Sequence, residues 1–129
     1  MIEAGGTSPG PRIGTTLQEF RGKLFLFGGI RTMSLTDKAL NDLYMFCIRK
    51  NCNYLTLSYP IETNTWTQIQ TFHQPPPRYA HTSVIWENKF YILGGTDTKW
   101  QNEFDVWYLD LDSMNQTFGL LLYNNNFQV

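Results

Sequence analysis

Short segments with alternating or clustered apolar residues recur along the chain, each bounded by glycine, proline, asparagine or aspartate. The segments are rich in valine, isoleucine, threonine and aromatic residues, a composition typical of β-strands. The polar stretches 30–41 and 96–104 contain few apolar residues at the spacing that a helix requires, so we expect loops there. We therefore predict eight strands, at residues 15–20, 23–28, 42–47, 65–71, 81–86, 89–94, 105–110 and 117–123.

The eight predicted strands fall into two sets of four, because the sequence repeats itself. Four pairs of segments match: 11–12 with 77–78, 25–29 with 91–95, 41–44 with 104–107, and 59–66 with 111–118. The offset between the copies falls from 66 to 63 and then to 52 positions along the chain. Extra residues in the first copy are expected in loops, since a loop lengthens at small entropic cost. The underlying unit is therefore 52 residues long.

The matched segments resemble the kelch repeat family. The second copy carries Pro-Arg-Tyr-Ala-His at 77–81, a double glycine at the end of 90–95, and Asp-Val-Trp at 105–107. The first copy carries the same frame in Pro11-Arg12, Gly28-Gly29, Asn41-Asp42-Leu43-Tyr44 and Trp66. One double glycine is a weak signal, but two in the same ordered frame, at the period of kelch repeats, form a strong one.

The resemblance implies an all-β fold, namely two four-stranded antiparallel blades of a kelch-type β-propeller that form an incomplete ring. Residues 11–71 would form the first blade, with an insertion at about 47–57, and residues 72–123 the second. Residues 1–10 would be an interblade loop or N-terminal tail, and residues 124–129 a polar C-terminal tail.

Each motif residue has an expected physical role. The double glycines end a strand where the backbone bends or approaches a neighbour closely. The ring at the Trp66 position packs between blades, although the second copy has Phe118 there. We expect Arg12 and Arg78 to be structural, because both copies contain them. His81 is expected to make a structural hydrogen bond.

Two blades cannot close a propeller ring, which requires roughly four to eight. We therefore expect a fragment, or a subunit whose ring is completed by other copies or by another chain. The segment 5–9 resembles a loop that leaves a preceding blade.

Composition and charge narrow the possible partners. The 10 basic residues are scattered and nearly balanced by 11 acidic ones, so we expect neither nucleic acid nor a membrane as a partner. There is no visible signal peptide and no apolar run of spanning length. The only cysteines, Cys47 and Cys52, favour two free thiols in a cytoplasmic protein; a local disulfide and, more remotely, a metal site stay open.

Candidate catalytic chemistry is sparse. The only histidines are His73 and His81, and no nucleophilic triad, carboxylate pair or phosphate-binding loop stands out. We expect no enzymatic activity, no cofactor and no metal.

Binding through loops on a rigid scaffold is therefore the predicted function. By resemblance, the loops 30–41, 71–79 and 96–104 share one face of the propeller. Trp100 is the leading contact residue because it lies in a polar loop, and tryptophan is common at interface hot spots; its alternative role is packing on the neighbouring blade. Arg31 and Tyr79 are further candidates. We predict a scaffold or adaptor for an unknown protein; the alternatives are part of a kelch-propeller enzyme whose active site lies on missing blades, or a structural subunit of a larger assembly.

Overall fold

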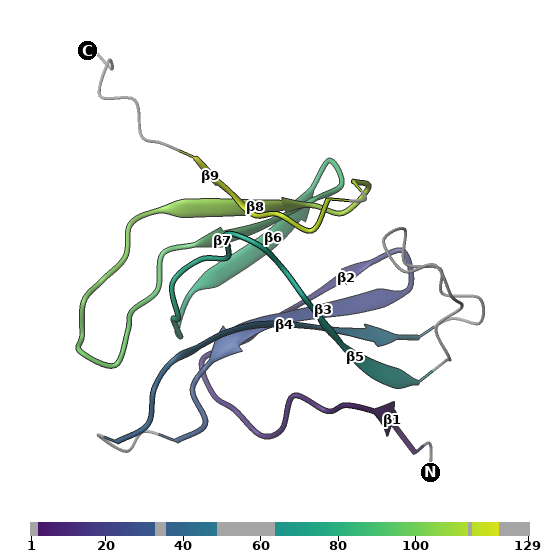
Figure 1. Ribbon diagram of the computed structural model, residues 1–129, viewed down its shortest axis with the longest axis horizontal. Helices are drawn as coiled ribbons and strands as arrows, with labels where there is room; N and C mark the ends of the chain where they lie inside the picture. The colour runs from purple at the N-terminus through teal and green to yellow at the C-terminus, as the bar shows by residue number, and fades with distance from the viewer. Residues whose placement is uncertain (1–2, 33–35, 49–63, 114, 122–129) are drawn as a thin grey trace.

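Two β-sheets lie face to face in the computed structural model, which describes residues 3–32, 36–48, 64–113 and 115–121 (Figure 1). The first sheet has the strand order β1-β5-β4-β3-β2, and the second has the order β6-β7-β8-β9. Neither sheet is accompanied by a helix in the described residues. The expected C-terminal tail and the larger part of the expected insertion lie outside the described residues.

The strands lie where the alternation of apolar and polar residues predicts them, within a few residues at either end. The first sheet contains β1 (Gly5–Gly6), β2 (Thr16–Phe20), β3 (Lys23–Gly29), β4 (Leu40–Cys47) and β5 (Thr65–Ile69). The second contains β6 (Thr82–Trp86), β7 (Lys89–Leu93), β8 (Val106–Asp110) and β9 (Gly119–Leu121). Each sheet therefore holds the four antiparallel strands expected of one blade, and the predicted all-β class is confirmed.

Strand β1 is an addition that the strand pattern does not predict, because two glycines carry no apolar signal. It pairs in parallel with β5, with Gly5 opposite Thr65 and Gly6 opposite Trp66. The second sheet has a matching feature, a parallel bridge between Phe72 and Thr117. In both copies, the segment that precedes the blade thus runs along the blade's outermost strand.

The hydrophobic core lies between the two sheets. Phe25 and Phe90 face each other across the interface, with ring centroids 6.2 Å apart, and the rings of Phe27 and Phe118 meet edge to face at 5.8 Å. Phe118 thus packs between the blades, as expected of the ring at this position of the motif. The core also includes Leu43, Met45, Cys47, Ile69, Ile92, Leu109 and Leu111. Burial of a large apolar side chain contributes about 1.5–3 kcal/mol, so this shared core is what joins the two blades.

The first double glycine is a point of close approach between the blades. Gly28 has a φ of 63°, and a Cβ atom there would lie 2.8 Å from the carbonyl oxygen of Arg78. The N–H of Gly29 donates a hydrogen bond to the same oxygen at 2.9 Å. The expectation that glycine is required here for a bend and a close neighbour is confirmed.

The expectation of two free thiols is wrong for Cys47, which is disulfide-bonded. Cys47 ends β4 and is fully buried in the core between the sheets. The chain's other cysteine, Cys52, lies outside the described residues. The thiol argument for a cytoplasmic setting is therefore lost, and the cytoplasmic location stays a prediction.

Candidate functional site

Arg78 organises the loops of the second blade from a fully buried position. Its two terminal nitrogens bind the Asp105 carboxylate at 2.5 and 3.0 Å, and Nη1 also donates to the carbonyl of Gly94 at 2.8 Å. Its Nε donates to the carbonyl of Pro76 at 3.1 Å. One guanidinium thus ties the interblade loop to the end of β7 and to the residue that precedes β8.

The environment keeps Asp105 charged. Burial alone would raise the pKa of Asp105, but hydrogen bonds from Arg78 and Trp107, together with the charge of Arg78, hold this pKa below its ordinary value. Arg78 is therefore buried opposite an ionised partner, the condition under which a buried cation is tolerated.

Arg12 repeats this arrangement in the first blade. It binds Asp42 at 2.7 and 3.3 Å and donates to the carbonyl groups of Gly28 and Pro9. Its guanidinium also lies 5.4 Å from the ring centre of Tyr44. The expectation that Arg12 and Arg78 are structural is confirmed, since each connects the Pro-Arg, Gly-Gly and Asp segments of its own repeat.

His81 lies at the junction of the blades. Its Nε2 is 3.2 Å from the Thr16 hydroxyl, which in turn accepts a hydrogen bond from Ser83 at 2.6 Å. The imidazole meets the ring of Phe27 edge-on at 5.6 Å. Burial, and secondarily the charge of Arg78, lowers the pKa of His81 to about 4. His81 is therefore a neutral, structural residue at neutral pH, as the sequence predicts.

Three loops that are distant in sequence meet at one end of the two sheets, the left end in Figure 1. They follow β3, precede β6 and follow β7. Tyr79 and Thr96 exchange two backbone hydrogen bonds of 3.0 Å, and the N–H of Arg78 donates to the carbonyl of Leu40 at 3.0 Å. The Asn41 side chain donates to the carbonyl of Pro75 at 3.2 Å. The expectation that these loops share a face agrees with these contacts.

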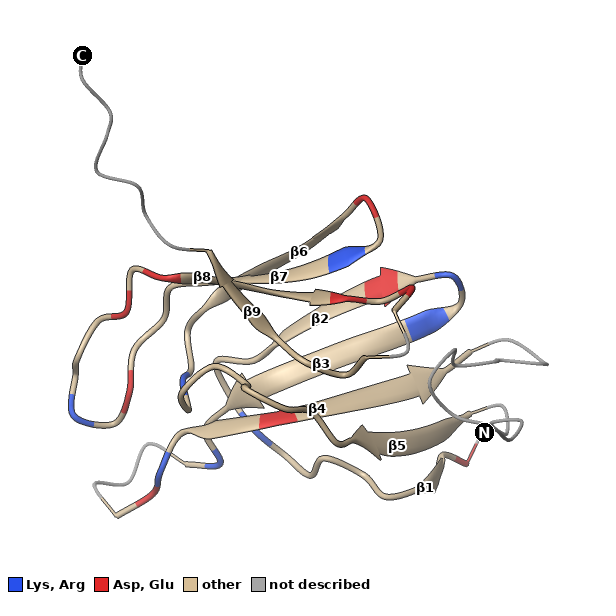
Figure 2. Cartoon of the chain, turned by 45° about the horizontal axis from the view of Figure 1, so that its top comes forward, with Lys and Arg blue, Asp and Glu red and all other residues tan. Residues whose placement is uncertain are grey.

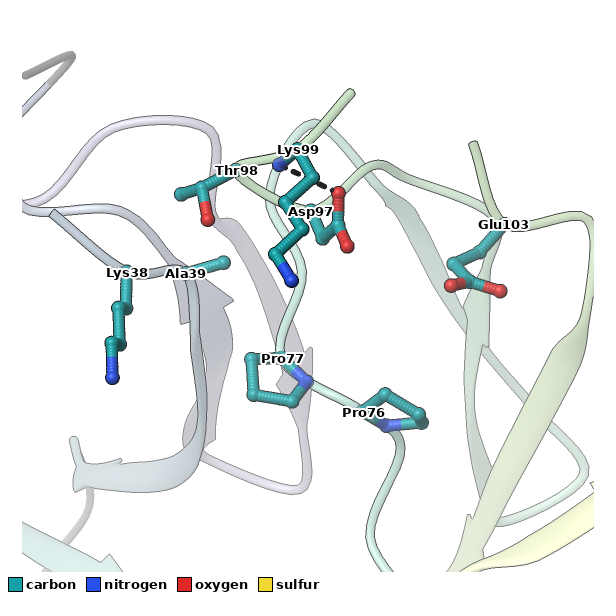
Figure 3. Close-up of a pocket in the computed structure, with 8 residues that line it drawn as sticks. All are labelled: Lys38, Ala39, Pro76, Pro77, Asp97, Thr98, Lys99 and Glu103. Atoms are coloured by element: carbon teal, nitrogen blue, oxygen red, sulfur yellow. Dashed lines mark hydrogen bonds between the residues drawn. The ribbon is translucent and has the colours of Figure 1, made fainter. Parts of the chain in front are cut away.

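A cavity of about 280 Å³ opens where the three loops meet (Figure 3). Two prolines, Pro76 and Pro77, come from the loop between the blades, and charged side chains of both signs come from the other two loops. We call this region the three-loop face. Its cavity is lined by Lys38, Ala39, Pro76, Pro77, Asp97, Thr98, Lys99 and Glu103.

Trp100 projects from a tight turn beside this cavity. Oδ1 of Asp97 accepts hydrogen bonds from the backbone N–H groups of Lys99 at 2.8 Å and Gln101 at 3.0 Å, and thereby holds the turn. Trp100 has a φ of 60°, and 68% of its surface is exposed. Most of the indole surface is therefore open to solvent within the described residues, which agrees with a contact role, and packing on a neighbouring blade stays the alternative.

The other two predicted contact residues lie in different environments. Arg31 is exposed two residues after the end of β3 and stays a candidate. Tyr79 is only 7% exposed because it packs in a small core with Ile30 and Ala39. The side chain of Tyr79 thus supports the three-loop face from beneath and offers a partner little surface.

Phe104 is a candidate contact that the sequence reasoning missed. It is 91% exposed at the end of the loop that carries Trp100. The repeat alignment placed Phe104 in the segment that matches 41–44, and this assignment concealed its character as an isolated aromatic residue in a polar loop. Together, Trp100 and Phe104 give this loop two solvent-facing rings.

Other kinds of site have little support in the described part of the chain. No three His, Cys, Asp or Glu side chains there are grouped so that they could hold a metal ion. The same residues include no helix of the length and apolar character needed to cross a membrane.

The two stacked sheets, one of five strands including the short β1 and one of four, are blades of a β-propeller. The chain superposes on 40% of the solved structure of YjhT with a TM-score of 0.66, over 92% of its own length and at 16% identity, which supports the fold alone. The sequence profile of the KLHDC2/KLHL20/DRC7 Kelch-repeats domain matches residues 1–118. The chain therefore belongs to the kelch-repeat family, and the resemblance is confirmed.

Two curated relatives are much longer than this chain. Human host cell factor 1 is 31% identical over 120 residues, which cover 84% of this chain and 5% of that protein. The Rho GTPase-activating protein gacHH of Dictyostelium discoideum is 34% identical over 97 residues, which cover 73% of this chain and 5% of that protein. The chain thus spans about one twentieth of the length of these relatives.

Proposed function

We propose that this chain is a kelch-repeat protein-interaction module that binds a segment of another protein through the three-loop face. The observation that carries the proposal is the convergence of three loops around one cavity, with the exposed rings of Trp100 and Phe104 on the loop that borders it. Exposed aromatic residues beside a concave site are typical of residues that dominate binding energy.

The frame beneath the face supports this proposal, because affinity depends on how little must be ordered on binding. The pair of Arg78 and Asp105 fixes both ends of the loop that carries Trp100, through Gly94 and Asp105 itself. Asp97 fixes the turn within that loop. The aromatic side chains are thus presented by a loop whose backbone is already held in place.

The cavity chemistry suits a peptide segment with both apolar and charged groups. Pro76 and Pro77 supply apolar surface, and in Figure 3 Lys38 and Glu103 lie on opposite sides, with Lys99 and Asp97 between them. Charges of both signs at the rim of an apolar site select a partner by complementarity and suppress wrong partners. Two similar proteins are named as a host cell factor and as a Rho GTPase-activating protein. For this chain we propose a scaffold role without catalysis.

The test compares two exposed tryptophans. Trp100 lies beside the three-loop face, whereas Trp86, 61% exposed, lies at the end of β6 next to its hairpin turn. Proteins retained by immobilised wild-type chain, Trp100→Ala and Trp86→Ala would be quantified by mass spectrometry. The leading retained protein would then be purified and its Kd measured directly. We expect Trp100→Ala to weaken binding by about 30-fold, the scale of a 2 kcal/mol hot spot, and Trp86→Ala to leave it unchanged.

Equal affinity of the wild-type chain and Trp100→Ala for that purified protein would overturn the assignment of the face. A combined Trp100→Ala and Phe104→Ala variant guards against compensation between the two rings. If this double variant also binds like the wild type, the three-loop face is not the binding surface.

A further inference from the structure

The outer face of the second blade, on the side away from the first blade, carries apolar side chains that the described part of the chain leaves exposed. Val84 is 45% exposed and Trp86 61%. The rings of Tyr91 and Tyr108 lie 6.3 Å apart on neighbouring strands of this face. We call this surface the second-blade outer face; its members are Val84, Trp86, Tyr91, Leu93, Tyr108 and Leu121.

The internal repeat indicates what kind of surface this face fits. In the second blade, Val84, Tyr91 and Tyr108 lie opposite one another across β6, β7 and β8. The same register positions in the first blade are Gln18, Phe25 and Met45. Phe25 and Met45 are fully buried against the second blade, and Gln18 donates to the carbonyl of Ser83 at 3.1 Å. The second-blade outer face is therefore the repeat equivalent of a surface that packs against another blade.

The first blade offers the complementary surface on its own outer side. Leu24, Phe46 and Trp66 lie opposite one another there, and the rings of Phe46 and Trp66 are 5.0 Å apart. These positions correspond in the repeat to Phe90, Leu109 and Phe118, which form the second blade's half of the interblade core. We call this surface the first-blade outer face; its members are Leu17, Leu24, Phe46, Ile48 and Trp66.

We propose that the second-blade outer face binds the first-blade outer face of a second copy of this chain, head to tail. The contact would repeat the interblade interface already present within the chain. Charged residues lie mainly in the loops and near the strand ends (Figure 2). The strand registers place Glu19 beside Leu24 on the first-blade outer face, and Lys89 and Asp110 in the row of Trp86 on the second-blade outer face. Exposed apolar surface of this kind marks an interaction site.

The geometry predicts a closed assembly of defined size. A head-to-tail interface forms a ring when its rotation closes. Propellers contain roughly four to eight blades, so chains of two blades would close with about two to four copies. Light scattering of the 15.0 kDa chain should therefore give one mass that is two to four times the chain mass.

The first test places a charge on the second-blade outer face. Val84→Arg should reduce the measured mass to that of one chain, while Trp100→Ala, on the three-loop face, should leave the assembly intact. Circular dichroism would verify that Val84→Arg keeps its strands. A wild-type chain that is monomeric at every concentration, or a Val84→Arg variant with the wild-type mass, would overturn the proposal. Either result leaves the proposed function of the three-loop face untouched.

A second test determines which faces meet. Within the chain, the hydroxyl groups of Thr16 and Ser83 are 2.6 Å apart across the interblade interface. Their repeat equivalents are Thr82 of one copy and Leu17 of the next. A mixture of Thr82→Cys and Leu17→Cys chains should therefore form a disulfide-linked dimer, whereas each variant alone should behave like the wild type. Equal cross-linking of Thr82→Cys with itself, or none in the mixture, would refute a head-to-tail contact.

Discussion

Arg78 and Asp105 form a two-point ion pair, 2.5 and 3.0 Å long, between residues that are 27 positions apart in the chain. The arginine is fully buried, and its remaining hydrogen bonds go to backbone carbonyl groups. The pair of Arg12 and Asp42 repeats this geometry in the first blade. A kelch blade in this chain is thus held by one buried guanidinium that joins three separated motif segments.

We predict that Asp105→Asn destabilises the chain by about 3–5 kcal/mol, because it leaves the charge of Arg78 buried without a counter-charge. Asp112→Asn is the matched control, since Asp112 pairs with Arg21 at the exposed surface and such pairs contribute about 0–1 kcal/mol. Urea denaturation followed by circular dichroism measures both. Similar losses in the two variants would contradict a central role for the buried pair.

We also predict that Gly28→Ala is more damaging than Gly10→Ala. Both glycines have positive φ values, 63° and 73°, so both variants carry backbone strain of about 1–2 kcal/mol. At Gly28 the new Cβ would also lie 2.8 Å from the Arg78 carbonyl oxygen, whereas at Gly10 no atom lies within 4 Å. The difference between the two melting temperatures therefore isolates the steric cost of separating the blades. Equal melting temperatures would show that the blades separate without cost at this point.

The sequence was sufficient to predict the strands, because short apolar segments bounded by turn residues leave few alternatives to β-structure. The repetition of the Pro-Arg, Gly-Gly and Asp segments was sufficient to group these strands into two blades. The partners of Arg12 and Arg78 could not be derived from one sequence, since each pair joins residues about 30 positions apart through the fold. Strand β1 was missed because glycine pairs give no periodic signal.

The candidate site was only partly predictable. Trp100 stood out as an aromatic residue in a polar loop, and its exposure fits that interpretation. Tyr79 did not stand apart by sequence from an exposed tyrosine, because its burial depends on Ile30 and Ala39 in a distant loop. The cavity beside Pro76 and Pro77 arises from three loops and has no signature in any one of them.

The stability of the chain should fall as the pH decreases from about 6.5 to about 4. The pKa of His81 is lowered to about 4 in the folded state, whereas its ordinary value is 6.5, so the unfolded chain binds more protons in this window. The stability that His81 contributes is therefore fully present above pH 6.5 and is lost as protons bind the unfolded state. A shift of this size corresponds to the order of 3 kcal/mol.

His81→Gln should remove this pH dependence, because glutamine keeps a polar group near Thr16 but does not titrate. His73→Gln is the control, since His73 is exposed in the loop between the blades. The measurement is the urea midpoint at several pH values between 4 and 7. An unchanged slope in His81→Gln would assign the acid sensitivity to other groups. The pKa of the Asp105 carboxylate is lowered from its ordinary value of 3.8, so its contribution to stability is lost mainly below this pH window. The comparison of the two histidine variants is therefore unaffected.

Stability and partner binding should respond separately to substitution of Trp100. The indole is 68% exposed, so its removal in Trp100→Ala should change the free energy of unfolding by no more than about 0.5 kcal/mol. Trp100→Gly should be at least as stable as Trp100→Ala, because the φ of 60° favours glycine. Thermal melts of the three chains measure this order. A large drop in both variants would show that the indole packs against the protein, and the loss of partner binding in Trp100→Ala would then report unfolding rather than a lost contact.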